Sequence, residues 1–174
     1  GVMRPFWEAV TAMKIPIHFT VQGSGGMRHA RNERESYLEQ QSILLHWMES
    51  YPYSTVVMTH GLPWRTFMEN DRIRFPDAIW DVFKTPRCNM QLLFPIQIGG
   101  IWEYPWKEVE PTVKECVDKI GADHLIWGTD MPMVARFCTY RQTLDQYRVH
   151  CKFLSYSERE AILGGTVARI MNIE

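Results

Sequence analysis

The stretch HLIWGTDMP, residues 124–132, places a short apolar run directly before a carboxylate and a proline. The run is Leu125 to Trp127, and Asp130 follows it within three residues. A short apolar run bounded by glycine and proline predicts a buried β-strand. Asp130 would then lie at the tip of that strand, so the fold depends on whether the chain repeats this arrangement elsewhere.

Three further apolar segments repeat the pattern along the chain. The four predicted strands cover residues 15–19, 54–60, 90–94 and 124–128. Apolar residues at helical spacing predict helices over residues 3–13, 33–50, 76–84, 107–120, 139–154 and 158–171. Ser157 and Glu160 resemble a capping box for the last helix. Short apolar strands that alternate with helices predict an α/β fold with a buried parallel sheet, either doubly wound or a (β/α) barrel.

Composition excludes several classes of protein. The chain has 174 residues, 45% hydrophobic and 22% charged, which is ordinary for a globular protein. Nineteen basic and twenty acidic residues leave a net charge of −1, so nothing indicates a nucleic acid or an anionic membrane as partner. We expect no membrane span and no signal peptide, because no apolar run is long enough. Four scattered cysteines without a CxxC pair predict reduced thiols in a cytoplasmic protein.

Polar residues stand at the ends of three predicted strands. The first strand ends at His18, the second at His60 and the fourth leads to Asp130. The carboxyl ends of parallel strands share one rim, which is where a barrel builds its active site. Two imidazoles and a carboxylate could form a Zn²⁺ or Mn²⁺ site or an acid/base cluster. Taken singly, each histidine is more often a loop residue with a local partner.

Four segments resemble the amidohydrolase superfamily, and within it the "amidohydrolase 2" branch of decarboxylases, hydratases and lactonases that act on small carboxylated compounds. These segments read IPIHFT, VVMTHGLP, HLIWGTDMP and ILGGTVARIMNI. In that family the fifth strand ends in His, the sixth in His-Gly, and the eighth in Asp within G-(S/T)-D-x-P. The resemblance runs from about residue 3 to the last residue, and Thr166 replaces an asparagine that is structural in the family.

The resemblance implies roles for the residues at the rim. His18 would be the fifth-strand metal ligand, and Asp130 would bind metal and handle the proton of the attacking water. His60 would lie near the metal and handle protons or polarise the substrate. Arg65 and Arg136 are candidates for binding the carboxylate of a small-molecule substrate. Gly128 would leave backbone room at the rim, and residues 23–26 would form a flexible loop over the site.

The resemblance covers only part of the family's fold. The family's first strand supplies an H-x-H pair of metal ligands, and this chain contains no H-x-H. A whole barrel takes about 250 residues. We therefore expect residues 1–174 to form one partial domain, the C-terminal half of a TIM (β/α)₈ barrel, with strands five to eight present and strands one to four missing.

A half-barrel has consequences for assembly and for metal binding. Two free sheet edges and one exposed apolar face would need a cover, and a second copy related by a two-fold axis would supply it. We therefore expect a homo-oligomer. The resemblance implies a divalent metal, Zn²⁺ first and Mn²⁺ second, bound weakly or not at all without the H-x-H pair.

Three functions stay open at this point. The first is a metal-dependent hydrolase or decarboxylase, with this fragment of low activity on its own. The second is a metal-free lactonase of the same branch, in which Asp130 activates water directly. The third is an inactive half-barrel that serves as an oligomeric scaffold. Metal content and sensitivity to chelators distinguish the first two.

Overall fold

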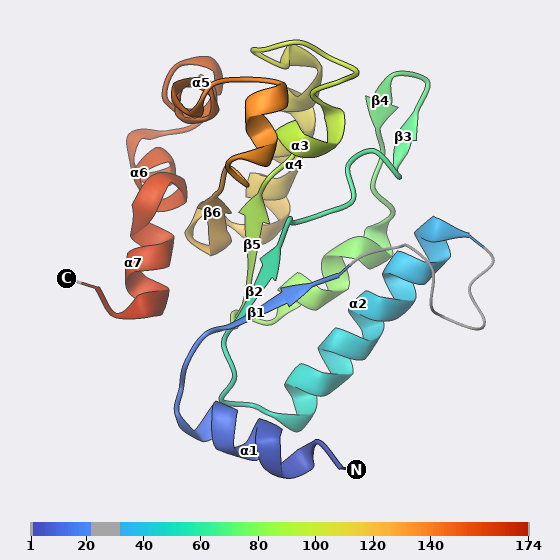
Figure 1. Ribbon diagram of the computed structural model, residues 1–174, viewed down its shortest axis with the longest axis vertical. Coiled ribbons are helices and arrows are strands. Elements are labelled where there is room, and N and C mark those ends of the chain that lie inside the picture. The colour runs from blue at the N-terminus through green and yellow to red at the C-terminus, as the bar shows by residue number, and fades with distance from the viewer. Residues whose placement is uncertain (1, 22–31, 174) are drawn as a thin grey trace.

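Four parallel strands form the central sheet of the computed structural model, which describes residues 2–21 and 32–173 (Figure 1). The sheet order is β1-β2-β5-β6, and the strands are β1 (Ile17–Thr20), β2 (Val56–Thr59), β5 (Cys88–Leu92) and β6 (Leu125–Trp127). Phe19 is level with Met58, Met58 with Met90, and Met90 with Leu125. All four predicted strands are therefore confirmed, in parallel and in chain order.

Helices connect the strands and pack on the sheet. The α-helices are α1 (Arg4–Ala12), α2 (Glu33–Ser50), α3 (Pro95–Ile98), α4 (Glu110–Ile120), α5 (Tyr140–Asp145), α6 (Tyr156–Glu160) and α7 (Thr166–Met171). The 3₁₀ helices are η1 (Asp77–Lys84), η2 (Lys107–Val109), η3 (Ala122–His124) and η4 (Met133–Arg136), and the π-helices are η5 (Gln146–His150) and η6 (Ala161–Gly165). The glycine-rich loop expected over the site, residues 23–26, lies outside the described residues.

The sequence located the long helices better than the short ones. The helix predicted over residues 33–50 is α2, whose N-cap residue Asn32 accepts a hydrogen bond from the Glu35 amide. The capping box predicted at Ser157 and Glu160 is wrong by two residues. Ser155 and Glu158 form it, because Ser155 is the last extended residue before the helix begins.

Two local features were not predicted. Met68–Glu69 (β3) and Arg72–Ile73 (β4) form a small antiparallel hairpin, and α3 follows β5 directly. Arg65 lies in a turn before β3. The hairpin and this turn occupy the connection between β2 and η1, at the carboxyl end of β2.

The two faces of the sheet differ in chemistry. Met58, Met90 and Leu125 point into the main hydrophobic core beneath the helices. On the opposite face, which is the inner face of the barrel arc, the strands carry mainly polar residues: His18, Thr20, Thr59, Asn89 and Gln91, together with Val57 and Ile126. The expectation of one exposed apolar face is therefore wrong for these strands.

The C-terminal helix covers part of that inner face. Ile170 of α7 packs with Val57 and Ile126 in a small second cluster, in which all three are buried. At the other edge of the sheet, His18 and Thr20 of β1 are exposed. The inner face is thus covered near β6 and open near β1.

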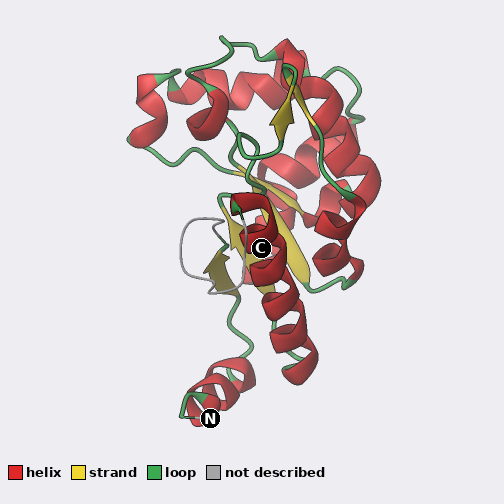
Figure 2. Cartoon of the chain, turned by 90° about the vertical axis from the view of Figure 1, so that its right-hand side faces the viewer, coloured by secondary structure: helices red, strands yellow, loops and turns green. Residues whose placement is uncertain are grey.

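Figure 1 shows α1 at the end of the molecule remote from α5 and the hairpin, and Figure 2 shows the N-terminus at the same end. Trp7 of α1 packs edge-on against Trp47 of α2, with ring centroids 5.2 Å apart. Among the described residues, no helix is both long and apolar enough to cross a membrane. The four cysteines are free and buried.

Candidate active site

His60 follows β2 directly and adopts a left-handed backbone conformation, with φ 64°. Gly61 continues in the same region with φ 63°. A non-glycine residue pays about 1–2 kcal/mol for this conformation, so it persists only where the surroundings hold it. The ring Nδ1 of His60 is buried and has no hydrogen-bond partner within the described chain. The imidazole is therefore held at the strand end with one nitrogen already removed from solvent.

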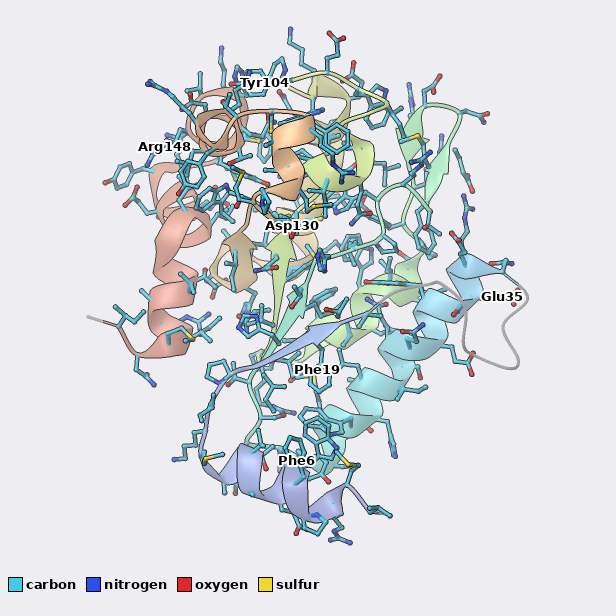
Figure 3. All side chains as sticks on the ribbon, viewed as in Figure 1. Phe6, Phe19, Glu35, Tyr104, Asp130 and Arg148 are labelled. Carbon is cyan, nitrogen blue, oxygen red and sulfur yellow. The ribbon has the colours of Figure 1, made fainter. Side chains whose placement is uncertain are left out.

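Asp130 has a comparable local geometry at the end of β6. Its φ is 51°, and its carbonyl oxygen accepts hydrogen bonds from the amides of Met133 (2.7 Å) and Val134 (3.3 Å). The following Met131–Pro132 peptide is cis. Asp130 lies just past the carboxyl ends of the strands, near the middle of the molecule (Figure 3). The carboxylate is half-buried, so it can meet a bound molecule and remain partly hydrated.

Gln91 of β5 lies between these two strand ends, and sequence reasoning missed it. Its Oε1 accepts a hydrogen bond from the His60 amide at 3.3 Å. Its side-chain amide also approaches Gly128, since a Cβ built there would lie 3.6 Å from its Cδ. The alternation of β5 could have indicated Gln91, because the polar residues Asn89 and Gln91 alternate with apolar ones and so share one face of the sheet.

The sheet order sets the spacing of His60 and Asp130. They follow β2 and β6, and β5 lies between those strands. Two strand spacings correspond to about 10 Å. A small ring or a short carboxylic acid bound across β5 could therefore approach both side chains at once.

His18 lies lower in the sheet than predicted. It is the second residue of β1, not the last, and is level with Val57, three residues before His60. Three residues correspond to about 10 Å along a strand, and β1 is three strand spacings, about 14 Å, from β6. Metal ligand atoms lie about 2.0–2.2 Å from a zinc ion, so a shared site would require the His18 and Asp130 side chains to converge across the inner face.

Metal-binding clusters are absent from the described part of the chain. No group of three or more His, Cys, Asp and Glu side chains lies close enough there to hold an ion. The structure thus places His60 and Asp130 at one rim and does not gather them with His18 into a metal site.

The two candidate arginines are both exposed. Arg65 lies in the turn after β2. Arg136 donates from Nε to the carbonyl oxygen of Met133 at 3.1 Å, and its guanidinium lies 5.4 Å from the centroid of the Phe137 ring. Both follow strands whose ends carry a candidate catalytic residue, so both remain available to an anionic group near the rim.

Comparison with known proteins gives one family and a set of related structures. The family model described as "Amidohydrolase" matches residues 1–173. None of the curated proteins compared matches significantly. Thirteen chains of solved structures match.

Three of these structures illustrate the likeness. An amidohydrolase from Burkholderia multivorans with bound zinc has a TM-score of 0.73 and 17% identity, covering 98% of this chain and 58% of its own. A 2,6-dihydroxybenzoate decarboxylase from Rhizobium has a TM-score of 0.63 and 16% identity, covering 98% and 55%. A dihydroxybenzoic acid decarboxylase from Polaromonas with bound manganese and the inhibitor 2-nitroresorcinol has a TM-score of 0.60 and 18% identity, covering 97% and 53%.

The chain thus spans little more than half the length of the structures that it matches. Its four parallel strands with flanking helices have the fold of half of a TIM barrel, as predicted. At identities this low, the likeness to the solved structures concerns the fold.

Proposed function

Since the chain belongs to the amidohydrolase family, we propose that it provides the His60- and Asp130-bearing half of an active site for hydrolysis or decarboxylation of a small carboxylated substrate. One observation carries the proposal. The two side chains expected to handle protons both stand at strand ends in left-handed backbone conformations. Strain of this kind concentrates at functional sites.

The chemistry of the two side chains suits proton transfer. The buried Nδ1 of His60 leaves Nε2 as the nitrogen that can exchange a proton with a bound molecule. The Asp130 carboxylate can accept the proton of an attacking water, or hold one for return to the product. In decarboxylation, the carbon that loses CO₂ needs a proton, which either group can deliver. A positioned acid or base contributes typically 10²- to 10⁴-fold in rate.

Related structures suggest the substrate class. Two of them are decarboxylases of dihydroxybenzoates, so small aromatic carboxylic acids are the first compounds to assay. Arg65 and Arg136 are proposed to bind the substrate carboxylate, since a guanidinium matches it with two parallel hydrogen bonds.

A divalent metal remains a proposal for the whole site. Related structures contain zinc or manganese, and when bound such an ion supplies Lewis-acid chemistry that activates water or polarises a carboxylate. Asp130 and His18 are suitable ligands by type, but no group of three or more such side chains within the described residues lies close enough to hold an ion. We therefore propose that this chain alone binds Zn²⁺, or Mn²⁺ as second choice, weakly or not at all. Elemental analysis that finds one tightly held metal ion per purified chain would contradict this.

The lack of a three-ligand cluster among the described residues also favours a second candidate, a metal-free lactonase. Asp130 would then activate water directly, and a lactone would replace the aromatic acid as substrate. Turnover that persists after dialysis against a chelator would support this candidate, and its complete loss, restored by Zn²⁺ or Mn²⁺, would support the metal-dependent enzyme.

The assembly is proposed to contain more than one copy. Within the described residues, the backbone of β1 is paired on one side only, and a cavity of about 250 Å³ beside it is lined by apolar side chains that include Phe19, Ile43 and Trp47. A second copy of the chain would cover this edge and complete the rim. Without a second copy, the half-barrel would remain an inactive scaffold. Light scattering tests this, and a monodisperse species of 20.5 kDa would contradict it.

Variants test the function itself. His60→Ala and Asp130→Ala should each lower turnover of an identified substrate by about 10²-fold or more. His46→Ala is the matched control, since His46 is an exposed histidine of α2. Equal turnover in all three variants and the parent protein would overturn the proposed roles.

A further inference from the structure

The backbone of residues 60–62 is held by side chains from two other parts of the chain. Gln97 donates from Nε2 to the carbonyl oxygens of His60 (3.3 Å) and Leu62 (3.0 Å). The Tyr37 hydroxyl donates to the carbonyl oxygen of Gly61 at 3.2 Å. Side chains from outside residues 60–62 thus bind three consecutive carbonyl groups of this segment.

Gln91 holds the same segment from the other side. Its Oε1 accepts from the His60 amide, so both backbone polar groups of His60 are bound to glutamine side chains. The two glutamines come from β5 and from α3, which follows β5 directly. A segment held at this many points is restricted to one conformation, although its left-handed dihedral angles are intrinsically unfavourable.

We infer that Gln97 is a positioning residue, which acts with Tyr37 to hold His60 in its left-handed conformation and so aims the imidazole at the rim. The inference rests on the proposed function for its purpose, because aiming matters only if His60 meets a substrate. The restraint on the backbone of residues 60–62 follows from the hydrogen bonds alone. An amide nitrogen has two N–H groups, which is the number needed to bind the carbonyls on both sides of Gly61.

The surroundings of Tyr37 suit this role. Its side chain is fully buried and packs edge-on against Phe67, with ring centroids 6.4 Å apart. Burial raises the pKa of the Tyr37 hydroxyl, so the group stays protonated and can donate. Gln41 of α2 donates from Nε2 to the same hydroxyl oxygen at 3.4 Å, which orients it toward Gly61.

The test compares Gln97→Met with Gln146→Met in the whole chain. Methionine keeps the length of the side chain but cannot donate a hydrogen bond. Gln146 is the control because its Nε2 contacts Cys151 and no residue of the 60–62 segment; it is buried, whereas Gln97 is half-buried. A typical hydrogen bond contributes about 0.5–1.5 kcal/mol, so loss of two should raise amide exchange in residues 58–64 by about tenfold to a hundredfold.

A second measurement follows the imidazole directly. In spectra of protein labelled at histidine, the His60 ring signals should shift and broaden in Gln97→Met, and should match those of the parent protein in Gln146→Met. A role confined to general stability would raise exchange throughout the chain and leave the ring signals in place, and that result overturns the inference. Unchanged exchange in residues 58–64 overturns it as well.

Tyr37→Phe provides the test if Gln97→Met does not fold. It removes one hydroxyl and keeps the ring packing, so exchange in residues 58–64 should rise by a few-fold only. Unchanged amide exchange in residues 58–64 of Tyr37→Phe contradicts the inference. Neither the amide-exchange nor the ring-signal measurement requires turnover. An absence of activity in the parent protein would therefore count against the proposed function and not against the inference about Gln97.

Discussion

Substitution of Gly61 by alanine tests the geometry of the rim most directly. Gly61 has φ 63°, and an added Cβ would lie 2.1 Å from the carbonyl oxygen of Gln91 in the neighbouring strand. A left-handed conformation costs alanine about 1–2 kcal/mol. The backbone must also move by about 1 Å to relieve the overlap, and overpacking of this kind typically costs about 1–3 kcal/mol. We expect Gly61→Ala to lower the free energy of unfolding by about 2–5 kcal/mol.

Urea denaturation followed by circular dichroism provides the assay. With a denaturant dependence of about 2 kcal/mol per molar urea, the midpoint should fall by about 1–2.5 M. Gly128→Ala is the matched control at the end of β6. Its Cβ would meet the nearest atom, Cδ1 of Leu93, at 3.5 Å, an ordinary contact, and its φ is not positive.

Gly128 was expected to leave backbone room at the rim, and the structure leaves space for a methyl group there at ordinary contact distances. Gly128→Ala should change the midpoint by less than about 0.5 M. A Gly61→Ala variant as stable as the parent protein would refute the reasoning, because it would mean that the β2 end does not approach β5 as described.

Three further predictions concern other parts of the chain. Arg87 donates to three carbonyl oxygens around the C-terminal end of α2, so Arg87→Met should lower the unfolding free energy by about 2–4 kcal/mol in urea titrations, and Arg87→Lys should recover only part of the loss. Hydrogen bonds from Ser155 lower the pKa of Glu158, so its contribution to stability is present above pH 4.5 and is lost as pH falls through the lowered value. Melting temperatures of the parent protein and Glu158→Gln should therefore converge in acid, and a constant difference would contradict this. Burial raises the pKa of Cys88 and Cys151 to about 12, so a thiol reagent at pH 8 should label neither within minutes in the folded chain and both in urea.

Local pattern was sufficient for the main elements and for two residues of the site. Apolar runs and helical spacing predicted the four parallel strands and α2, because burial of apolar side chains follows the period of each element. His60 and Asp130 were predicted at strand ends, since each directly follows or lies just beyond its own apolar run. Their membership in an amidohydrolase domain followed from the same short motifs.

Tertiary structure alone decided how these elements meet. The depth of His18 follows from the pairing of β1 with β2, which places it level with Val57, and a sequence run does not specify strand register. The hydrogen bonds from Gln97 and Tyr37 to residues 60–62 join positions 24 to 37 residues apart. Such contacts depend on packing between elements, whereas local pattern carries only the periodicity of each element on its own. The sequence by itself therefore determined the strands, helices and rim residues, and long-range packing determined their register, their backbone conformation and the depth of His18 in the sheet.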